Sequence, residues 1–220
     1  GALIPPDDAS LPGGHVVLVD GMSVIFRSFY GWKNRAEPLL NSKGEDVSVQ
    51  YSVAHAILGV LELDPTHLAV CFDAKGKTFR EDVYPDYKAN RPPMPDDLAA
   101  QIEPLVEAVA ALGWPVLSVE GVEADDVIAT LSERAAAQGW HCIISTGDKD
   151  MTQLVNDNVR LINTMTDTVY DQATVREKFG VAPEVMVDYL ALIGDSVDNI
   201  PGVPKVGPKT AVKWLNEYGS

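Results

Sequence analysis

The chain has 220 residues, which excludes a disulfide-stapled miniprotein. Its hydrophobic residues make up 46% and its charged residues 22%, which excludes a wholly disordered chain, and its glycines and prolines are scattered, which excludes a collagen-like one. Its 17 basic and 32 acidic residues give a net charge of −15, which taken alone argues against a polyanionic partner because long-range steering would be repulsive. The charge is uneven, however: residues 74–95 hold five basic against three acidic residues, and residues 199–213 hold three lysines and no acid.

The opening residues, GALIPPDDASLPGG, contain no apolar signal segment, so we expect residues 1–14 to form a loose tail without a targeting function. Polar residues interrupt the apolar stretches of the remaining chain, which predicts a soluble protein. Cys71 and Cys142 each lie inside an apolar run and are predicted to be buried free thiols in a reducing, cytoplasmic compartment.

From residue 15 onward, short β-branched runs alternate with amphipathic stretches, a pattern typical of an α/β fold with a mostly parallel central sheet flanked by helices. Strands are predicted over residues 16–19, 68–72, 116–119 and 142–145. Helices are predicted over residues 24–30, 49–63, 97–112, 124–138 and 149–155. After residue 159 the pattern changes to short strands and small helices, so we expect a core over residues 15–182 and a subdomain over residues 183–220.

Acidic residues follow every one of the predicted strands. They are Asp20, Asp73, Glu123, Asp125, Asp126, Asp148 and Asp150. Because the carboxyl ends of parallel strands share one edge of a sheet, these side chains are predicted to face one crevice. Any one of them could be a helix N-cap, but the group is larger than capping requires. Oxygen ligands without nearby Cys or His indicate a site for Mg²⁺ or Mn²⁺, whose charge would offset the repulsion between the carboxylates.

A further acidic pair, Asp195 and Asp198, has the i, i+3 spacing that would place both carboxylates on one helical turn, although a cap or a solvated face is an equally simple explanation. Arg27, on the helix after Asp20, could reach a phosphate held near the acids or could lie on the helix surface. There is no Ser, His or Cys constellation that would supply a protein nucleophile.

Two segments carry cations suited to nucleic acid. Residues 74–95 interleave basic side chains with aromatic ones, including Tyr87 and Arg91, which suits a single strand whose bases stack while cations follow its phosphates. An ordinary solvated loop with packed tyrosines is the alternative. The second segment, GVPKVGPKTA, is predicted to form a tight turn that opens onto a helix beginning at Pro208 and grips one phosphate with its backbone amides. A plain turn between two helices is the alternative there.

Taken together, the motifs LVDG, YKANRP, EADDVIA, GDKDMTQL and GDSVDNIPGV followed by GPKTA resemble the 5′-nuclease (flap endonuclease) family, most closely the amino-terminal exonuclease domain of bacterial DNA polymerase I. The resemblance covers residues 15–218, nearly the whole chain. It implies a PIN-like core, a helical arch near residues 74–95 and a C-terminal helix-three-turn-helix subdomain that binds DNA.

The resemblance also implies roles for individual residues. The first metal ion would take Asp20, Asp73, Glu123 and Asp125, and the second would take Asp126, Asp148, Asp150, Asp195 and Asp198. Lys88 and Arg80 look like the arch cations that contact the scissile phosphate, and Arg27 looks like the family's active-site arginine. The residues expected to hold DNA elsewhere are Tyr87, Arg91, Gly202, Lys205, Gly207, Lys209 and Thr210.

The implied reaction is phosphodiester hydrolysis at 5′ ends, flaps or nicks by two Mg²⁺ ions, with Mn²⁺ able to substitute. The implied partners are DNA and a linked or separate DNA polymerase, with the nuclease acting as a bacterial, nucleoid-associated monomer. Two departures stand out: Lys205 occupies a position where the family often has Gly, and the chain stops at Ser220, as expected of either a fragment or a short homologue. A non-catalytic DNA-structure-binding module and a phosphohydrolase of small phosphoesters are the two alternatives.

Overall fold

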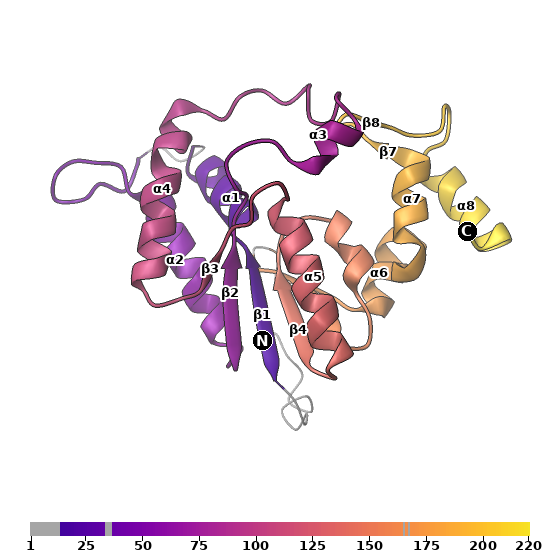
Figure 1. Ribbon diagram of the computed structural model, residues 1–220, viewed down its shortest axis with the longest axis horizontal. Coiled ribbons are helices and arrows are strands. Elements are labelled where there is room, and N and C mark those ends of the chain that lie inside the picture. Colours follow the sequence, from indigo (N-terminus) through magenta and orange to yellow (C-terminus); the bar gives the residue numbers. More distant parts are fainter. Residues whose placement is uncertain (1–13, 34–36, 165, 167) are drawn as a thin grey trace.

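A computed structural model describes residues 14–33, 37–164, 166 and 168–220, so all of the predicted tail over residues 1–14 except Gly14 lies outside the described residues. A central sheet carries helices on both faces (Figure 1). Its strands are β1 (His15–Asp20), β2 (His67–Cys71), β3 (Val116–Leu117), β4 (His141–Ser145), β5 (Val159–Asn163) and β6 (Thr168–Tyr170). They lie in the order β3-β2-β1-β4-β5-β6, and every pair is parallel except the antiparallel pair of β5 and β6. This confirms the predicted mostly parallel sheet flanked by helices.

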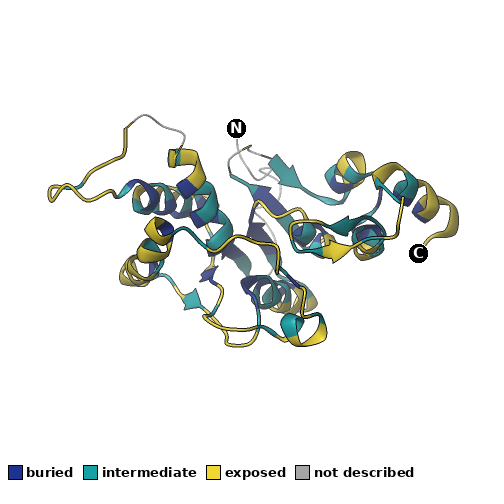
Figure 2. Ribbon diagram, turned by 90° about the horizontal axis from the view of Figure 1, so that it is seen from above, coloured by how far each residue is buried: buried dark blue, intermediate teal, exposed yellow. Residues whose placement is uncertain are grey.

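Helices α1, α2 and α4 pack on one face of the sheet, and α5 with the C-terminal helices packs on the other. The helix bounds are α1 (Gly21–Lys33), α2 (Ser48–Leu61), α3 (Phe79–Val83), α4 (Asp96–Ala111), α5 (Ala124–Ala137), α6 (Gln172–Phe179), α7 (Met186–Ile193) and α8 (Pro208–Tyr218). Alternation along β1 divides the core, because Val17 and Val19 pack toward the first face while Leu18 packs toward the second. Figure 2 shows the buried strands at the centre and exposed residues along the outer helices.

Three predicted elements differ from the structure. The predicted strand 116–119 pairs only over Val116–Leu117, because it lies at the sheet edge beside β2, which itself ends at Cys71. The predicted helix 149–155 is a short 3₁₀ helix, η2 (Asp150–Leu154), in which i→i+3 bonds such as Thr152 N–H to the Lys149 carbonyl replace the α-helical pattern. In residues 74–95, α3 is the one described helix, and turns and extended backbone make up most of the expected arch.

The last part of the chain joins α7 to α8 through a small hairpin of β7 (Gly194–Asp195) and β8 (Ile200–Pro201). A Cβ at Gly202 would lie 2.4 Å from the Ile193 backbone carbon, so the hairpin closes only around glycine. Another 3₁₀ helix, η3 (Pro183–Val185), precedes α7, and α8 begins at Pro208 as predicted.

Both cysteines, Cys71 and Cys142, are buried and unbridged, as predicted. Within the described part of the chain, no helix combines the length and the apolar surface needed to cross a bilayer.

Candidate active site

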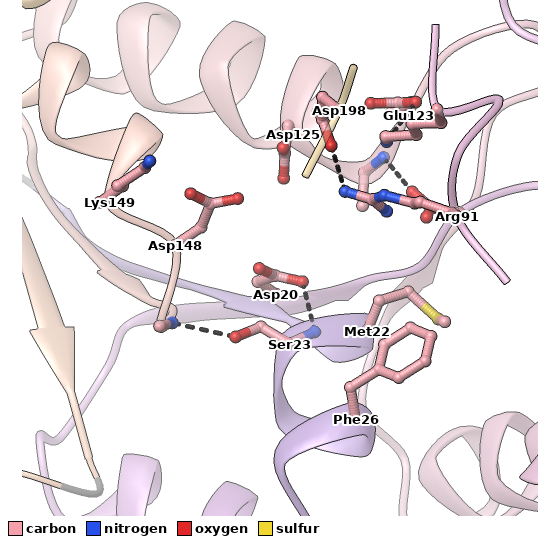
Figure 3. A pocket seen from close by; sticks show the side chains of 14 residues that line it. Asp20, Met22, Ser23, Phe26, Arg91, Glu123, Asp125, Asp148, Lys149 and Asp198 are labelled. Atoms are coloured by element: carbon pink, nitrogen blue, oxygen red, sulfur yellow. Dashed lines mark hydrogen bonds and ion pairs between the residues drawn. The ribbon is translucent and has the colours of Figure 1, made fainter. Parts of the chain in front are cut away.

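A crevice of about 460 Å³ opens where β1 and β4 end (Figure 3). The strand order reverses between these two neighbours, and ligands of open α/β sheets bind in the crevice at such a reversal. The residues that line it include acids, bases and a few apolar side chains: Asp20, Met22, Ser23, Phe26, Asp73, Lys88, Arg91, Glu123, Ala124, Asp125, Gly147, Asp148, Lys149 and Asp198. The sequence therefore predicted the place of the crevice and part of its acidic lining.

Asp20 is the deepest of these acids, with 5% of its surface exposed at the end of β1. Its carboxylate accepts hydrogen bonds from the Ser23 backbone N–H at 2.9 Å and from the Thr146 hydroxyl at 2.7 Å. The Gly147 N–H in turn donates to the Ser23 hydroxyl at 2.9 Å. Burial raises the pKa of Asp20, and the charges of nearby carboxylates act in the same direction. This network holds one carboxylate rigidly at the junction of β1 and β4.

Asp125 lies close to several other carboxylates of the crevice. Burial raises the pKa of Asp125 to about 8, and the charges of Asp20, Asp148 and Asp73 act in the same direction. In Figure 3 the carboxylates of Asp20, Asp125 and Asp148 point into the same space. A cation would relieve this repulsion.

The N-terminus of α5 orients three further acids. Glu123 is the N-cap, and its N–H donates to the Asp126 carboxylate at 2.9 Å in a capping box. Asp73, from the loop after β2, accepts from the Ala124 N–H at 2.8 Å. Asp126 does not line the crevice, because Arg80 binds both of its oxygens at 2.6 and 2.8 Å. That pairing lowers the pKa of Asp126.

Asp148 lines the crevice, whereas Asp150 does not. Asp148 accepts from the Asp150 N–H at 2.8 Å, so the two acids belong to one turn. The Oδ1 atom of Asp150 is buried and has no hydrogen-bond donor. Burial and the neighbouring Asp148 charge raise the pKa of Asp150 to about 6. A buried carboxylate oxygen without a donor is an arrangement that suits a cation.

Of the two interpretations offered for Asp195 and Asp198, the shared helical turn is not observed. They lie at the end of β7 and in the turn before β8, and the Asp195 carboxylate accepts the N–H groups of Val197 and Asp198 at 2.7 and 3.2 Å. Of the two, only Asp198 lines the crevice. Lys149 reaches Asp195 at 3.3 Å.

The basic side chains at the crevice are paired with acids in or beside it. Lys88 Nζ lies 2.7 Å from Glu123, and the Arg91 guanidinium binds Asp198. Arg91 and Lys149 lie on opposite sides of the crevice in Figure 3. Arg27 does not line it, and donates instead to the Thr164 hydroxyl at 3.1 Å.

Among the described ranges, 14–33, 37–164, 166 and 168–220, no three acidic, His or Cys side chains are gathered closely enough to hold a metal ion as they stand. The donor chemistry nevertheless fits hard divalent cations, because the acids offer oxygen alone and no His or Cys lines the crevice. The buried Asp150 oxygen without a donor fits the same ligand.

Some of the residues predicted to hold DNA are exposed in the structure, and others are buried or paired. Tyr87 is 9% exposed, and its hydroxyl donates to Glu123 at 3.0 Å, so its ring is not presented for base stacking in this arrangement. Lys205 and Lys209 are exposed beside the N-terminus of α8, and Thr210 is half-buried. Gly207 has an extended φ of −113°, and a Cβ added there would meet open space, so its backbone conformation does not itself require glycine.

Several residues of the site were not singled out from the sequence. Thr146 and Ser23 hold Asp20, and Lys149 supplies a cation opposite Arg91. Ser23 lies three residues after an acid at a helix start, which is a recognisable capping spacing. The role of Thr146 depends on the pairing of β1 with β4, which no local pattern reveals.

Comparison with known families divides the chain into two matched parts. Residues 15–180 match the family described as "5′-3′ exonuclease, N-terminal resolvase-like domain", and residues 181–220 match "5′-3′ exonuclease, C-terminal SAM fold".

Two relatives are longer than this chain. DNA polymerase I of Pseudomonas aeruginosa is 52% identical over 205 residues, which cover 93% of this chain and 22% of the relative. The 5′-3′ exonuclease of Aquifex aeolicus is 44% identical over 204 residues, which cover 92% of this chain and 69% of the relative. The chain therefore spans about a fifth of the polymerase and about two thirds of the exonuclease.

A solved structure has the same fold. It is a complex of the bacteriophage T5 flap endonuclease with DNA and metal ions, with 25% sequence identity and a TM-score of 0.75, covering 94% of this chain and 76% of the other. Its DNA and metal ions belong to that protein.

Proposed function

The chain belongs to the 5′-3′ exonuclease family, and we propose that its crevice hydrolyses DNA phosphodiesters at free 5′ ends, flaps and nicks with the help of two divalent cations, Mg²⁺ foremost. The observation that carries the proposal is the convergence of four acids on one crevice with cations at its sides: Asp20, Asp73 and Asp148 at or just after the ends of β1, β2 and β4, and Asp125 in the first turn of α5. The family relation supports a nuclease function, and the crevice supplies the residues.

The acids would hold the cations, which when bound supply Lewis-acid activation of water and charge neutralisation at the phosphate. The first group proposed is Asp20, Asp73, Glu123 and Asp125, and the second is Asp126, Asp148, Asp150, Asp195 and Asp198. Asp126 belongs to the second group only if it gives up its bidentate contact with Arg80.

Lys88 would stabilise the negative charge that develops on the scissile phosphate, because its ammonium lies within the crevice on the side chain of Glu123. Arg80 and Arg27 do not line the crevice, and they are proposed to act on it through neighbouring residues. Arg80 would orient the N-terminus of α5 through Asp126, and Arg27 would add positive charge behind Asp20.

The exposed turn before α8 would hold duplex phosphates away from the reacting one. Lys205 and Lys209 supply positive charge there, at the positive end of the α8 dipole. Gly207 leaves open space at that helix start, which permits a phosphate to approach closely. The proposed partners are DNA and a linked or separate polymerase, with the nuclease part acting as a monomer in the bacterial cytoplasm.

The test compares a 5′-labelled flap, a nicked duplex and a single strand, each with Mg²⁺ and with excess chelator. We expect Mg²⁺-dependent cleavage of the flap and the nick, and none in chelator. Asp125→Asn should abolish cleavage, while the matched control Asp157→Asn, at an exposed acid bonded to Gln172, should not. Cleavage that persists in chelator would contradict the metal-dependent reaction. Hydrolysis of a chromogenic phosphodiester without preference for branched DNA would instead favour a small-phosphoester hydrolase.

A further inference from the structure

Two segments that are far apart in the chain are hydrogen-bonded to each other beside the crevice. The first is residues 84–91, which carry Lys88 and Arg91, and the second is residues 195–199, which lead into β8. We call this contact the clasp. Its backbone centre is the Lys88 N–H, which donates to the Asp198 carbonyl at 2.9 Å. In Figure 1 the segment around α3 lies beside β7 and β8, at the place where the clasp forms.

Two asparagine amides close the clasp from opposite sides. Asn90 Nδ2 donates to the Ser196 carbonyl at 2.7 Å, and Asn199 Nδ2 donates to the Asp86 carbonyl at 2.8 Å. Each asparagine thus satisfies a backbone carbonyl of the opposite segment. The contacts are reciprocal, so the two segments have a defined register rather than a loose approach.

Two residues of the clasp also have an unusual backbone conformation. Lys88 and Asn199 have φ angles of +56° and +59°, in the left-handed region that non-glycine residues rarely occupy. Such conformations persist where surrounding contacts hold them, and they gather at functional sites. Here the contacts that hold them are those of the clasp itself.

We infer that Asn90 and Asn199 are positioning residues for the nuclease reaction: they fix the segment bearing Lys88 onto the turn bearing Asp198, so that the phosphate-directed ammonium and that carboxylate enter the crevice as one unit. Neither asparagine lines the crevice, so neither touches the reacting phosphate. The inference rests on the proposed function, because it assigns these amides a role in the same reaction.

The test uses Asn90→Ala and Asn199→Gly in the full chain. Glycine is chosen at position 199 because it removes the amide but tolerates the positive φ. Each variant should lower the single-turnover cleavage rate at saturating enzyme by about threefold to tenfold, the range expected for one lost hydrogen bond. Asn158→Ala is the matched control, since that amide donates to the Trp140 carbonyl at 3.3 Å beside the amino-terminal ends of β4 and β5, the end of the strands opposite the crevice. Its rate should equal that of the wild type.

A double-mutant cycle separates positioning from a merely structural role. If the amides act through Lys88, then adding either substitution to Lys88→Ala should cause little further loss of rate. Amide hydrogen exchange at Lys88 supplies a readout other than activity, and it should be faster in both variants because the contact to Asp198 is released.

A wild-type rate in both variants, or an undiminished loss in the Lys88→Ala background, would overturn the inference. Asn90→Ala tests the clasp from the other segment if Asn199→Gly folds poorly. Absence of cleavage by the wild-type chain would contradict the proposed function instead. In that case amide hydrogen exchange at Lys88 still tests the clasp, and an unchanged exchange rate in both variants would contradict the role given to the two asparagines.

Discussion

Lys205 has a φ of +67°, and Lys88 and Asn199 also adopt left-handed backbone conformations. For a residue with a Cβ this region costs about 1–2 kcal/mol. At Lys88 and Asn199 the clasp holds the conformation. Lys205 is exposed in the turn before α8, so its side chain and its backbone can be tested separately.

Lys205→Gly should increase the free energy of unfolding relative to Lys205→Ala by about 1 kcal/mol, because both variants lose the charge and only glycine relieves the left-handed strain. Urea denaturation of the two variants measures the difference. Equal stability of the two would show that the turn changes its conformation when the lysine is removed.

Lys88→Ala should lower the single-turnover cleavage rate by on the order of 10²-fold, because an ammonium aimed at the developing phosphate charge is lost. Duplex affinity should change little, since one contact near the reacting phosphate contributes a small share of the whole interface. The matched control is Lys75→Ala, a cation of the same segment whose partner is Glu103 on the surface. A wild-type rate for Lys88→Ala would contradict a role of Lys88 in the reaction and leave it only the ion pair with Glu123.

At the level of elements, the turn from β8 to α8 has two glycines with different physical roles. Gly202 packs against the Ile193 backbone, while Gly207 has open space around it. Substitution at the first should therefore damage the fold, and substitution at the second should affect only what approaches from outside.

Gly207→Val should weaken duplex binding while the free energy of unfolding changes by less than about 1 kcal/mol, because an extended backbone accepts any side chain. Gly202→Ala is the contrasting variant and should lower stability. Lys209→Ala should reduce the slope of log affinity against log salt by roughly one unit if a single phosphate contact is lost. Unchanged affinity and slope in Lys209→Ala would make this segment an ordinary turn between helices.

For the whole molecule, the crowded acids make cation binding and stability interdependent. Metal binding to the folded state alone should raise the melting temperature, by the equivalent of about 2.7 kcal/mol at a concentration one hundred times the dissociation constant. Asp125→Asn should stabilise the metal-free protein, since it removes a buried acid repelled by Asp20, Asp148 and Asp73.

Thermal unfolding with Mg²⁺, with chelator and with NaCl of equal ionic strength tests this. We expect a Mg²⁺-specific rise in the wild type that Asp125→Asn loses. A rise reproduced fully by NaCl would indicate general screening of charge rather than a bound ion.

Local patterns were sufficient to predict four of the six described strands of the sheet, the crevice and its main acids. Strand-end carboxylates such as Asp20 and Asp148 follow β-branched runs directly, and the parallel arrangement of those runs brings their ends to one edge. The start of α8 was likewise predicted from Pro208, because proline at the first helical turn is a local preference.

The contacts around those acids required the tertiary structure, because they join residues that no local pattern connects. Asn199 meets Asp86 across 113 positions, Lys88 meets Glu123 across 35, and Thr146 meets Asp20 across 126. Capping and periodicity describe neighbours within a few residues, so they cannot say that Asp126 pairs with Arg80 or that Tyr87 is buried. The chain order thus specified which chemical groups were available, while packing of distant segments decided which of them meet in the crevice.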